Sequence, residues 1–554
     1  MNLILRGERV CRRCLQVFPL HTKSTELCTS ARPTVIGIPP SYTFTRVRSF
    51  GAQSSVKWTS RQIRSAFINY FIERDHQYVH SSSILPKKGE GSYFINAGMN
   101  QFKPIFLGTA DPQSSLAGYK KVVNSQKCIR VGGKHNDLEA VGQDTYHHTF
   151  FEMLGSWSFG CYFKKEACEM AWDLLTNVYK IPSDRLYVTY FAGDENIGVP
   201  EDTECKNIWK GIGVPENRIL PFGIKDNFWD MGETGPCGPC TEIHFDHIGN
   251  RDASSLVNRG SPDVVELWNL VFMQFDRQFD KTLQSLPQNH VDTGMGLERL
   301  TAVLQGKRSN YDTDLFQPLF DAIYQRGACE PYRGQFGAED KYNIDTAYRI
   351  VADHARMITV ALADGLRPGR QDLGSKLRQV MHRCLRQSTQ TLSCFSGTLS
   401  SLVPVVIGML GGAFPELEKN ENQVIDIISH VEKKYDQDIA VGNNMFDRAF
   451  AEYGGVSTLS GKQIWDLHDG RFGKHVSVDI IEHIAEQRGI GLNLEGFHEK
   501  LREHKLKTQR ETGKKFLNVT ASLLQQLKEK KSHSPVIHLN TTILKLRMDM
   551  CLKE

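Results

Sequence analysis

The spacing of apolar residues changes near residue 310 of this 554-residue chain, and this change constrains the fold more than any other feature. Before it, apolar runs are short, as in RLYVTYFAG (185–193), and VELWNLVFMQFDRQF (265–279) alternates like a strand. After it, TAYRIVADHARMITVALADG (346–365) and KLRQVMHRCLRQS (376–388) have helical spacing. We therefore expect an α+β domain with a largely antiparallel sheet, followed by a helical half.

The first 60 residues differ from the rest in charge. They contain nine basic and two acidic residues, with frequent Ser and Thr. This composition is typical of a mitochondrial transit peptide, and the alternative is a disordered basic tail. We predict a transit peptide at 1–55 and a location in the mitochondrial matrix. Without this segment the formal charge of +4 becomes about −3, so any nucleic acid must be bound through local patches. No apolar run reaches the length of about 18 residues that a membrane helix needs, so we expect no membrane contact.

The tetrapeptide CGPC, Cys237 to Cys240, is the only CxxC after residue 60. It fits a thiol–disulfide site, half of a zinc site or a tight loop. A redox CxxC usually begins a helix, but TEIHFDH follows here and is typical of a strand. His244 and His247 would point to opposite faces of that strand, so both cannot easily join the two cysteines. We expect a tight loop whose sulfurs are packing groups.

Known nucleotide signatures are absent, since GGVSTLSGKQ does not have P-loop spacing and no GxGxxG follows a strand. Three stretches could still build a phosphate site from side chains, because Arg and Lys hold phosphates and glycines let the backbone approach a ligand. Each, taken alone, also fits a buried core segment, a surface loop or a glycine turn. They are CIRVGGKHNDLEAVGQDTYHHTFFEMLGSWSFGCYF (128–163), DNFWDMGETGPCGPCTEIHFD (226–246) and VDTGMGLERL (291–300).

Together with LWNLVFMQF, and in this order, these stretches resemble the alanyl-tRNA synthetases, densely from about residue 60 to 370 and more weakly to about 510. With the leader, the chain resembles the mitochondrial form. The resemblance implies a class II synthetase catalytic domain at 56–305, an antiparallel sheet flanked by helices. It also implies an α-helical tRNA-recognition domain at 306–530, before an atypical tail at 531–554. Such enzymes activate alanine with ATP and Mg²⁺ and transfer it to tRNA(Ala). We expect a monomer.

The resemblance assigns roles to individual residues. Arg130 corresponds to the arginine that bridges the α-phosphate and the amino-acid carboxylate. Arg299 corresponds to the arginine that stacks near adenine and reaches the γ-phosphate. In-line attack on phosphorus needs positioning and cations rather than a strong base. Lys134 and Glu152 are further candidates on the same motif as Arg130. The implied ATP contacts are Arg130, His148, Trp229, Leu267, Trp268, Asn269, Gly296 and Arg299, and the implied alanine contacts are Asn269 and Asp292.

The family carries a zinc-dependent editing domain marked by HxxxH and CxxxH. Both patterns occur here, at His76–His80 and Cys240–His244, but inside the catalytic stretch. We interpret them as chance matches and expect neither editing nor zinc. The resemblance fades near residue 530, which suggests a truncated or alternatively spliced product, or an incomplete gene model.

The helical half implies tRNA contact through a basic stripe on one helix. Arg378, His382 and Arg386 recur every four residues and suit a phosphate backbone, although an ordinary solvated face is the alternative. Arg370 or Gln371 stands where the family has an asparagine that contacts a G·U pair, so we expect a relaxed or shifted identity element. The candidate tRNA contacts are Arg370, Arg378, His382, Arg386 and Asp469.

Two other hypotheses remain beside an alanine–tRNA ligase. The chain could be a non-catalytic tRNA-binding or regulatory fragment of the same family, or a thiol oxidoreductase that uses CGPC. The intact candidate residues for ATP and alanine favour the ligase.

Overall fold

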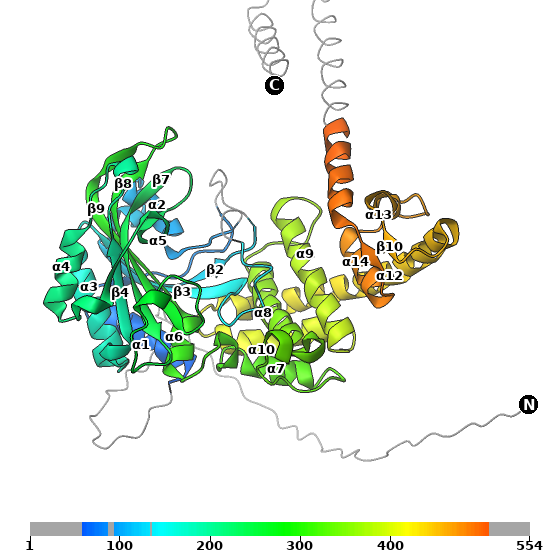
Figure 1. Ribbon diagram of the computed structural model, residues 1–554, viewed down its shortest axis with the longest axis horizontal. Coiled ribbons are helices and arrows are strands. Elements are labelled where there is room, and N and C mark those ends of the chain that lie inside the picture. The colour runs from blue at the N-terminus through cyan, green and yellow to red at the C-terminus, as the bar shows by residue number, and fades with distance from the viewer. Residues whose placement is uncertain (1–57, 87–93, 133–135, 509–554) are drawn as a thin grey trace, which may run out of the picture. The chain divides into compact units, whose positions relative to one another are not determined.

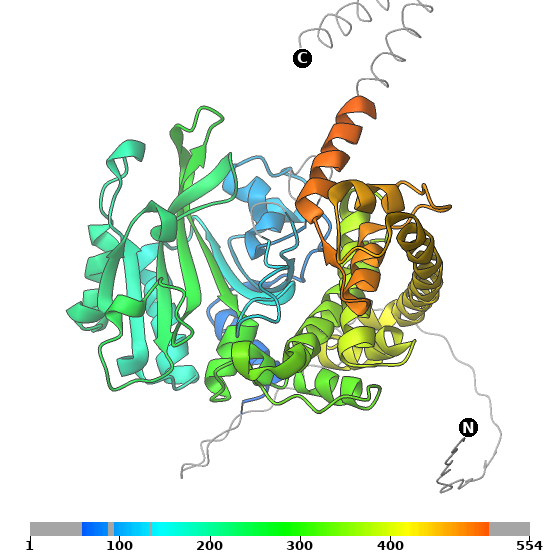
Figure 2. The ribbon, with the colours of Figure 1, turned by 45° about the vertical axis from the view of Figure 1, so that its right-hand side comes forward.

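The computed structural model describes residues 58–86, 94–132 and 136–508 (Figures 1 and 2). All of them belong to one of two compact units, Lys57–Glu554. The expected transit peptide (1–55), Lys134 and the tail (531–554) lie outside the described residues. The boundary expected between 305 and 306 stays a prediction.

A nine-stranded sheet forms the first part of the described chain, in the order β1-β2-β3-β9-β8-β7-β4-β5, with β6 beside β7. The pairs β1–β2 and β4–β5 are parallel and the others antiparallel, which confirms the expected largely antiparallel sheet. The strands are β1 (Gln77–Tyr78), β2 (Lys121–Ile129), β3 (Phe150–Phe159), β4 (Leu186–Phe191), β5 (Ile219–Phe222), β6 (Phe228–Asp230), β7 (Gly235–Asp246), β8 (Val264–Arg277) and β9 (Leu283–Gly296).

One face of the sheet is covered by helices. Trp268 and Leu270 of β8 share a buried core with α1, α3, α4 and α6, and the Trp268 ring lies 5.7 Å from that of Phe67 in α1. The next residues of β8 alternate to the opposite face, because strand side chains have a period of two. There Val271 packs with Trp157 and Phe102 beside α2. These helices are α1 (Ser60–Ile72), α2 (Lys103–Phe106), α3 (Lys164–Asp173), α4 (Thr203–Ile212) and α6 (Leu297–Leu304).

The CGPC tetrapeptide is not a loop. All four residues are buried in β7, which pairs on one side with β8. The register shifts between Cys237 and Cys240, where the strands bulge. A Cβ atom on Gly238 would lie 2.0 Å from the carbonyl oxygen of Phe272, so only glycine permits this approach. The expected loop at CGPC is therefore part of a strand, and two of its residues lie opposite three residues of β8.

The second part of the chain is helical, as predicted. It contains α7 (Gln317–Tyr324), α8 (Ile344–Ala363), α9 (Asp372–Arg386), α10 (Thr398–Leu410), α11 (Glu416–Lys419), α12 (Glu421–Tyr453), α13 (Gly461–His468) and α14 (Val478–Gln487), a small parallel pair of β10 (Thr458–Leu459) and β11 (Gly491–Leu492), and helical residues 494–508. Among the described helices, none is both long and apolar enough to cross a membrane.

Helix α8 joins the helical half to the sheet. Every residue of α8 except Ile344 is buried. It lies beside β2 and β3 (Figure 1), and its apolar residues share one core with Ile129 and Phe150 of those strands. The helical half therefore packs directly against the strands that carry the first candidate stretch.

Candidate functional site

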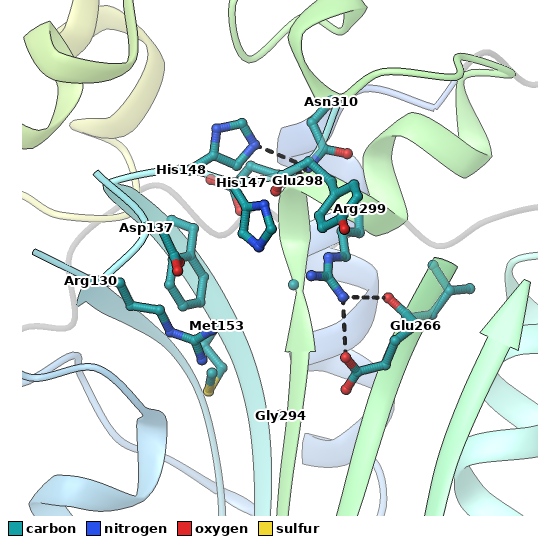
Figure 3. A pocket seen from close by; sticks show the side chains of 14 residues that line it. Arg130, Asp137, His147, His148, Met153, Glu266, Gly294, Glu298, Arg299 and Asn310 are labelled. Atoms are coloured by element: carbon teal, nitrogen blue, oxygen red, sulfur yellow. Dashed lines mark hydrogen bonds and ion pairs between the residues drawn. The ribbon is translucent and has the colours of Figure 1, made fainter. Parts of the chain in front are cut away.

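A pocket with an empty volume of about 580 Å³ lies on the face of the sheet opposite Trp268, and Figure 3 shows it from close by. Strands β3, β8 and β9 and the start of α6 supply part of its wall, so the first and third candidate stretches meet here. Both predicted arginines line it. Its full lining is Arg130, Asp137, Tyr146, His147, His148, Phe151, Met153, Glu266, Leu267, Gly294, Gly296, Glu298, Arg299 and Asn310.

Arg130 follows the last residue of β2 and has no anionic partner among the described residues. Its guanidinium carbon lies 4.9 Å from the centroid of the Phe151 ring. Its Nε is buried without a hydrogen-bond partner in the described part of the chain. A half-buried, uncompensated cation on a pocket wall is suited to an anionic ligand.

Arg299 lies in the first turn of α6 and is held against β8. Its Nη1 donates to the Glu266 carbonyl oxygen at 2.9 Å and lies 3.2 Å from Glu266 Oε2. The guanidinium also lies 5.1 Å from the Tyr146 ring centroid. Gly296 precedes α6 as its N-cap, where the backbone borders the pocket. A planar guanidinium fixed in this way can stack on a flat ring.

The His148 side chain is hydrogen-bonded through Nε2, while its buried Nδ1 lies near a carboxylate without a hydrogen bond among the described residues. Nε2 lies 3.0 Å from Asn310 Nδ2, and Nδ1 lies 3.4 Å from Asp353 Oδ1. Its ring stacks on Phe316 with centroids 5.1 Å apart. His148 lines the pocket as predicted, but it does so as a fixed wall.

The neighbouring His147 is the more accessible histidine of the pair. Its Nδ1 pairs with Asp144 Oδ2, and Figure 3 shows its ring between the Arg130 and Arg299 side chains. Burial alone would raise the pKa of Asp144, but hydrogen bonds from His147 outweigh burial and lower that pKa. The first candidate stretch contains both histidines, but the prediction named only His148.

Asp292, the predicted ammonium acceptor, lies on β9 directly opposite Trp157 of β3. The indole Nε1 of Trp157 donates to Asp292 Oδ1 at 2.6 Å. Burial raises the pKa of Asp292 to about 7, and the indole hydrogen bond limits this rise. Gly155 makes room for the indole, since a Cβ atom there would lie 2.0 Å from its ring. Sequence reasoning missed Trp157, although glycine two residues before tryptophan in a strand is a usable signal.

Asn269 presents a second acceptor on the same face of the sheet. It pairs with Gly294 of β9, and Val271 pairs with Asp292, so the Asn269 and Asp292 side chains point the same way. Asn269 Oδ1 is buried and has no hydrogen-bond partner among the described residues. A carboxylate and an unpaired amide oxygen together suit an ammonium group.

The three other predicted ATP contacts behave differently. Leu267 lines the pocket, in a bulge where β8 shifts register against β7. The Trp268 side chain does not, because it is 1% exposed and packs under α1 on the helix-covered face. An ATP contact through the Trp268 backbone stays a prediction. Trp229 also does not line the pocket, and packs near Trp157 and Cys240 toward the Asp292 end. A stretch of adjacent strand residues cannot all face one ligand, because their side chains alternate.

The basic stripe on α9 also differs from its prediction, because it faces α14 rather than solvent. His382 is 7% exposed, and its Nδ1 lies 3.2 Å from Asp479 Oδ2. Arg386 Nη1 lies 3.1 Å from Glu482 Oε2. Burial alone would raise the pKa of Asp479, but His382 and then the half-buried Arg378 lower it. His382 and Arg386 therefore form helix–helix contacts, whereas Arg370 and Asp469 are exposed.

The histidines of the HxxxH pattern contact protein groups rather than lying together at a metal site. His76 Nε2 lies 2.9 Å from the Tyr162 hydroxyl, and His80 pairs with Glu416. Within 58–86, 94–132 and 136–508, no group of three or more His, Cys, Asp and Glu residues is arranged to hold a metal. The absence of zinc stays a prediction. Glu152, the other minor candidate, is fully buried and pairs with Arg64 and Ser125.

Comparisons with known proteins agree with the family resemblance of the sequence motifs. A family model described as "tRNA synthetases class II (A)" matches residues 62–551. Cytoplasmic alanine–tRNA ligase of Caenorhabditis elegans is 51% identical over 85% of this chain and 49% of its own length. The mitochondrial alanine–tRNA ligases of Saccharomyces cerevisiae and Mus musculus are 50% and 52% identical, over 83% and 79% of this chain and 47% and 44% of their own lengths.

The chain thus spans about half the length of the curated relatives it matches. The matched family model covers the sheet, the pocket and the helical half, and it includes both pocket arginines and Asp292. Because this family model matches most of the chain, the chain belongs to the family described as "tRNA synthetases class II (A)".

Proposed function

We propose that this chain is an alanine–tRNA ligase, which activates alanine with ATP to alanyl-adenylate and transfers the alanyl group to the 3′ end of tRNA(Ala). The observation that supports this most directly is the pairing of two complementary sites on one sheet face. Arg130 offers an uncompensated cation, while Asp292 and the unpaired Oδ1 of Asn269 offer acceptors. An amino acid carries both charges that these groups would bind.

The proposed reaction follows from where the two charged groups of alanine would bind. Asp292 and Asn269 would hold the alanine ammonium, which leaves the carboxylate directed toward Arg130. That carboxylate attacks the α-phosphorus of ATP and pyrophosphate leaves, so no general base is needed. Arg130 would neutralise the charge that develops on the α-phosphate, and Arg299 would lie on adenine or hold the γ-phosphate. Trp157, Met153 and Trp229 would leave little room beyond the methyl group.

The donor groups of the pocket fit Mg²⁺ that arrives with ATP. Mg²⁺ commonly binds one or two protein carboxylates plus phosphate oxygens and water. Glu266, which borders the pocket, would be the residue to hold it. When bound, Mg²⁺ would offset charge on the phosphates.

We place this activity in the mitochondrial matrix, with tRNA(Ala), L-alanine and ATP as partners and the chain as a monomer. The basic, acid-poor composition of the first 60 residues supports the location. For tRNA, the exposed Arg370 and Asp469 are the better candidates, because His382 and Arg386 are occupied by α14.

The test is alanine-dependent exchange between ATP and labelled pyrophosphate by the full chain, followed by charging of mitochondrial tRNA(Ala). Exchange with alanine, and little with bulkier amino acids, is the expected result. The absence of exchange by a folded chain that still binds tRNA(Ala) would favour the non-catalytic fragment instead. A fluorescent fusion of the full chain that stays outside mitochondria would contradict the proposed location.

A further inference from the structure

Two side chains of α8, in the helical half, contact residues that line the pocket. Asp353 and Arg356 are three residues apart and therefore lie on one face of the helix. Both are 0% exposed. Each contacts a different wall of the pocket, and neither was suggested by the sequence. We infer that Arg356 and Asp353 are positioning residues for ATP, so that the helical half completes the activation site. This inference rests on the proposed function.

Arg356 binds the wall that carries Arg299. Its Nη2 donates to Glu298 Oε1 at 2.5 Å. Glu298 is 1% exposed, lines the pocket and directly precedes Arg299 in α6 (Figure 3). Both carboxylate oxygens of Glu298 also accept from the backbone N–H of Glu152 in β3, at 3.3 and 3.2 Å. The Arg356–Glu298 pair thus joins three elements, α8, α6 and β3.

The charge of Arg356 has one anionic partner in the described part of the chain. Glu298 is its only ion pair there. Its guanidinium otherwise lies between the rings of Phe150 and Phe316, 5.0 and 4.6 Å from their centroids. Nε and Nη1 have no hydrogen-bond partner among the described residues. The positive charge of Arg356 is therefore paired with Glu298, and a substitution that removes this charge would leave the buried Glu298 carboxylate without an ion pair.

Without Arg356, the unpaired carboxylate of Glu298 would weaken the binding of ATP. The pocket is proposed to take a triphosphate, and Glu298 is part of its wall. Coulomb repulsion between like charges is strong where water is excluded. Arg356 offsets this charge and also fixes the first turn of α6, which aims Arg299. Its loss should weaken ATP use while leaving the alanine end, built from Asp292 and Asn269, intact.

Asp353 binds the opposite wall. Its carboxylate accepts from the Thr149 backbone N–H at 3.1 and 3.2 Å and lies 3.4 Å from His148 Nδ1. Because Asn310 Nδ2 can only donate to His148 Nε2, the ring proton lies on Nδ1 and faces Asp353. The Asp353 carboxylate lies beside this nitrogen and favours the orientation of the pocket histidine by an electrostatic contact. The two α8 residues together hold the strand end before β3 and the start of α6.

The experiment compares Arg356→Gln with Arg349→Gln in the full chain, using pyrophosphate exchange, ATP binding by calorimetry and thermal unfolding. Arg349 is the matched control, since it is on α8, 0% exposed and paired with Asp340 at 3.7 Å, while its partner carbonyls on Gly142 and Gln335 do not line the pocket. Arg356→Gln should lower kcat/KM for ATP on the order of 10-fold to 100-fold with the KM for alanine unchanged. Arg349→Gln should lower the unfolding temperature only.

A rescue variant separates positioning from general damage. Glu298→Gln in the Arg356→Gln background removes the unpaired charge, so the double variant should bind ATP more tightly than Arg356→Gln alone. If Arg356→Gln does not fold, Arg356→Lys, which keeps the charge, is compared with Arg349→Lys by the same measurements.

Each outcome is decisive. Equal effects of the Arg356 and Arg349 variants on ATP, or no rescue by Glu298→Gln, overturn the inference while leaving the proposed function in place. A wild-type chain that binds ATP but shows no exchange overturns the proposed function, and the binding data then still decide the role of Arg356. A wild-type chain that binds no ATP overturns both.

Discussion

The indole Nε1–H of Trp157 in β3 donates a hydrogen bond to Asp292 Oδ1 in β9, with a nitrogen–oxygen distance of 2.6 Å. Among the described residues, Trp157 is the side chain that donates to this carboxylate. Burial raises the pKa of Asp292 to about 7. The group that is proposed to bind the alanine ammonium therefore titrates close to neutral pH.

The first prediction concerns pH. Asp292 must be ionised to hold an ammonium, so kcat/KM for alanine should fall about tenfold per pH unit below pH 7, since this ratio reports the free enzyme. Trp157→Phe removes the hydrogen bond that lowers the pKa of Asp292, so the midpoint should move to higher pH. Exchange kinetics from pH 5.5 to 9 would measure both. An alanine profile that is flat across this range would contradict the role of Asp292.

The second prediction concerns stability. A carboxyl group whose pKa is raised from 3.8 to about 7 on folding favours folding most when protonated and opposes it as pH rises through this window. The asparagine of Asp292→Asn does not titrate, so this variant should have a larger free energy of unfolding than the wild type at pH 8, by at most about 4 kcal/mol. The difference should vanish near pH 4. Denaturant unfolding at both pH values measures it, while alanine-dependent exchange should be lost at every pH.

The third prediction concerns Arg130. Because Arg130 is half-buried, has no ion pair among the described residues and has its guanidinium over the Phe151 ring, Arg130→Ala should lower the free energy of unfolding by no more than about 1 kcal/mol. It should lower alanine-dependent exchange on the order of 100-fold to 1,000-fold, as expected for a group that stabilises transition-state charge. Arg378→Ala serves as the comparison and should spare exchange. A large loss of stability in Arg130→Ala would point to a structural arginine.

The fourth prediction concerns the cysteines of CGPC. Burial raises the pKa of Cys237 to about 11 and that of Cys240 well above its usual range. Neither thiol should react with a thiol-specific reagent in the native protein at pH 8, whereas the exposed Cys161 should react readily. Mass spectrometry after brief labelling distinguishes them. Rapid labelling of Cys237 or Cys240 would revive the oxidoreductase hypothesis.

Much of the fold could be predicted because it depends on local periodicity. The alternation in 265–279 and the helical spacing after residue 345 correspond to β8 and α8. The prediction of a loop at CGPC was wrong, because these residues belong to strand β7 and pair with β8. The register between two strands depends on both strands, so one sequence segment does not reveal it. No single strand reveals where its partner bulges.

The site could be predicted only in part, for a similar reason. Residues that act through their own charge, such as Arg130 and Arg299, are recognisable within their motifs. Arg356 and Trp157 act through contacts with residues far away in the chain, so their spacing carries no such signal. The stripe on α9 misled for the opposite reason, since its acidic partner α14 lies about a hundred residues later.

Along strand β8, the effect of a substitution should depend on which face of the sheet the substituted residue faces, and this face alternates from one residue to the next. Trp268 and Leu270 face the helices, whereas Asn269 and Val271 face the side where alanine is proposed to bind. Inherited or engineered changes at Trp268 and Leu270 should therefore reduce the amount of protein, and changes at Asn269 between them should spare the amount but reduce specific activity. Along these few residues, abundance and activity measured for every substitution should oscillate out of phase, each with a period of two.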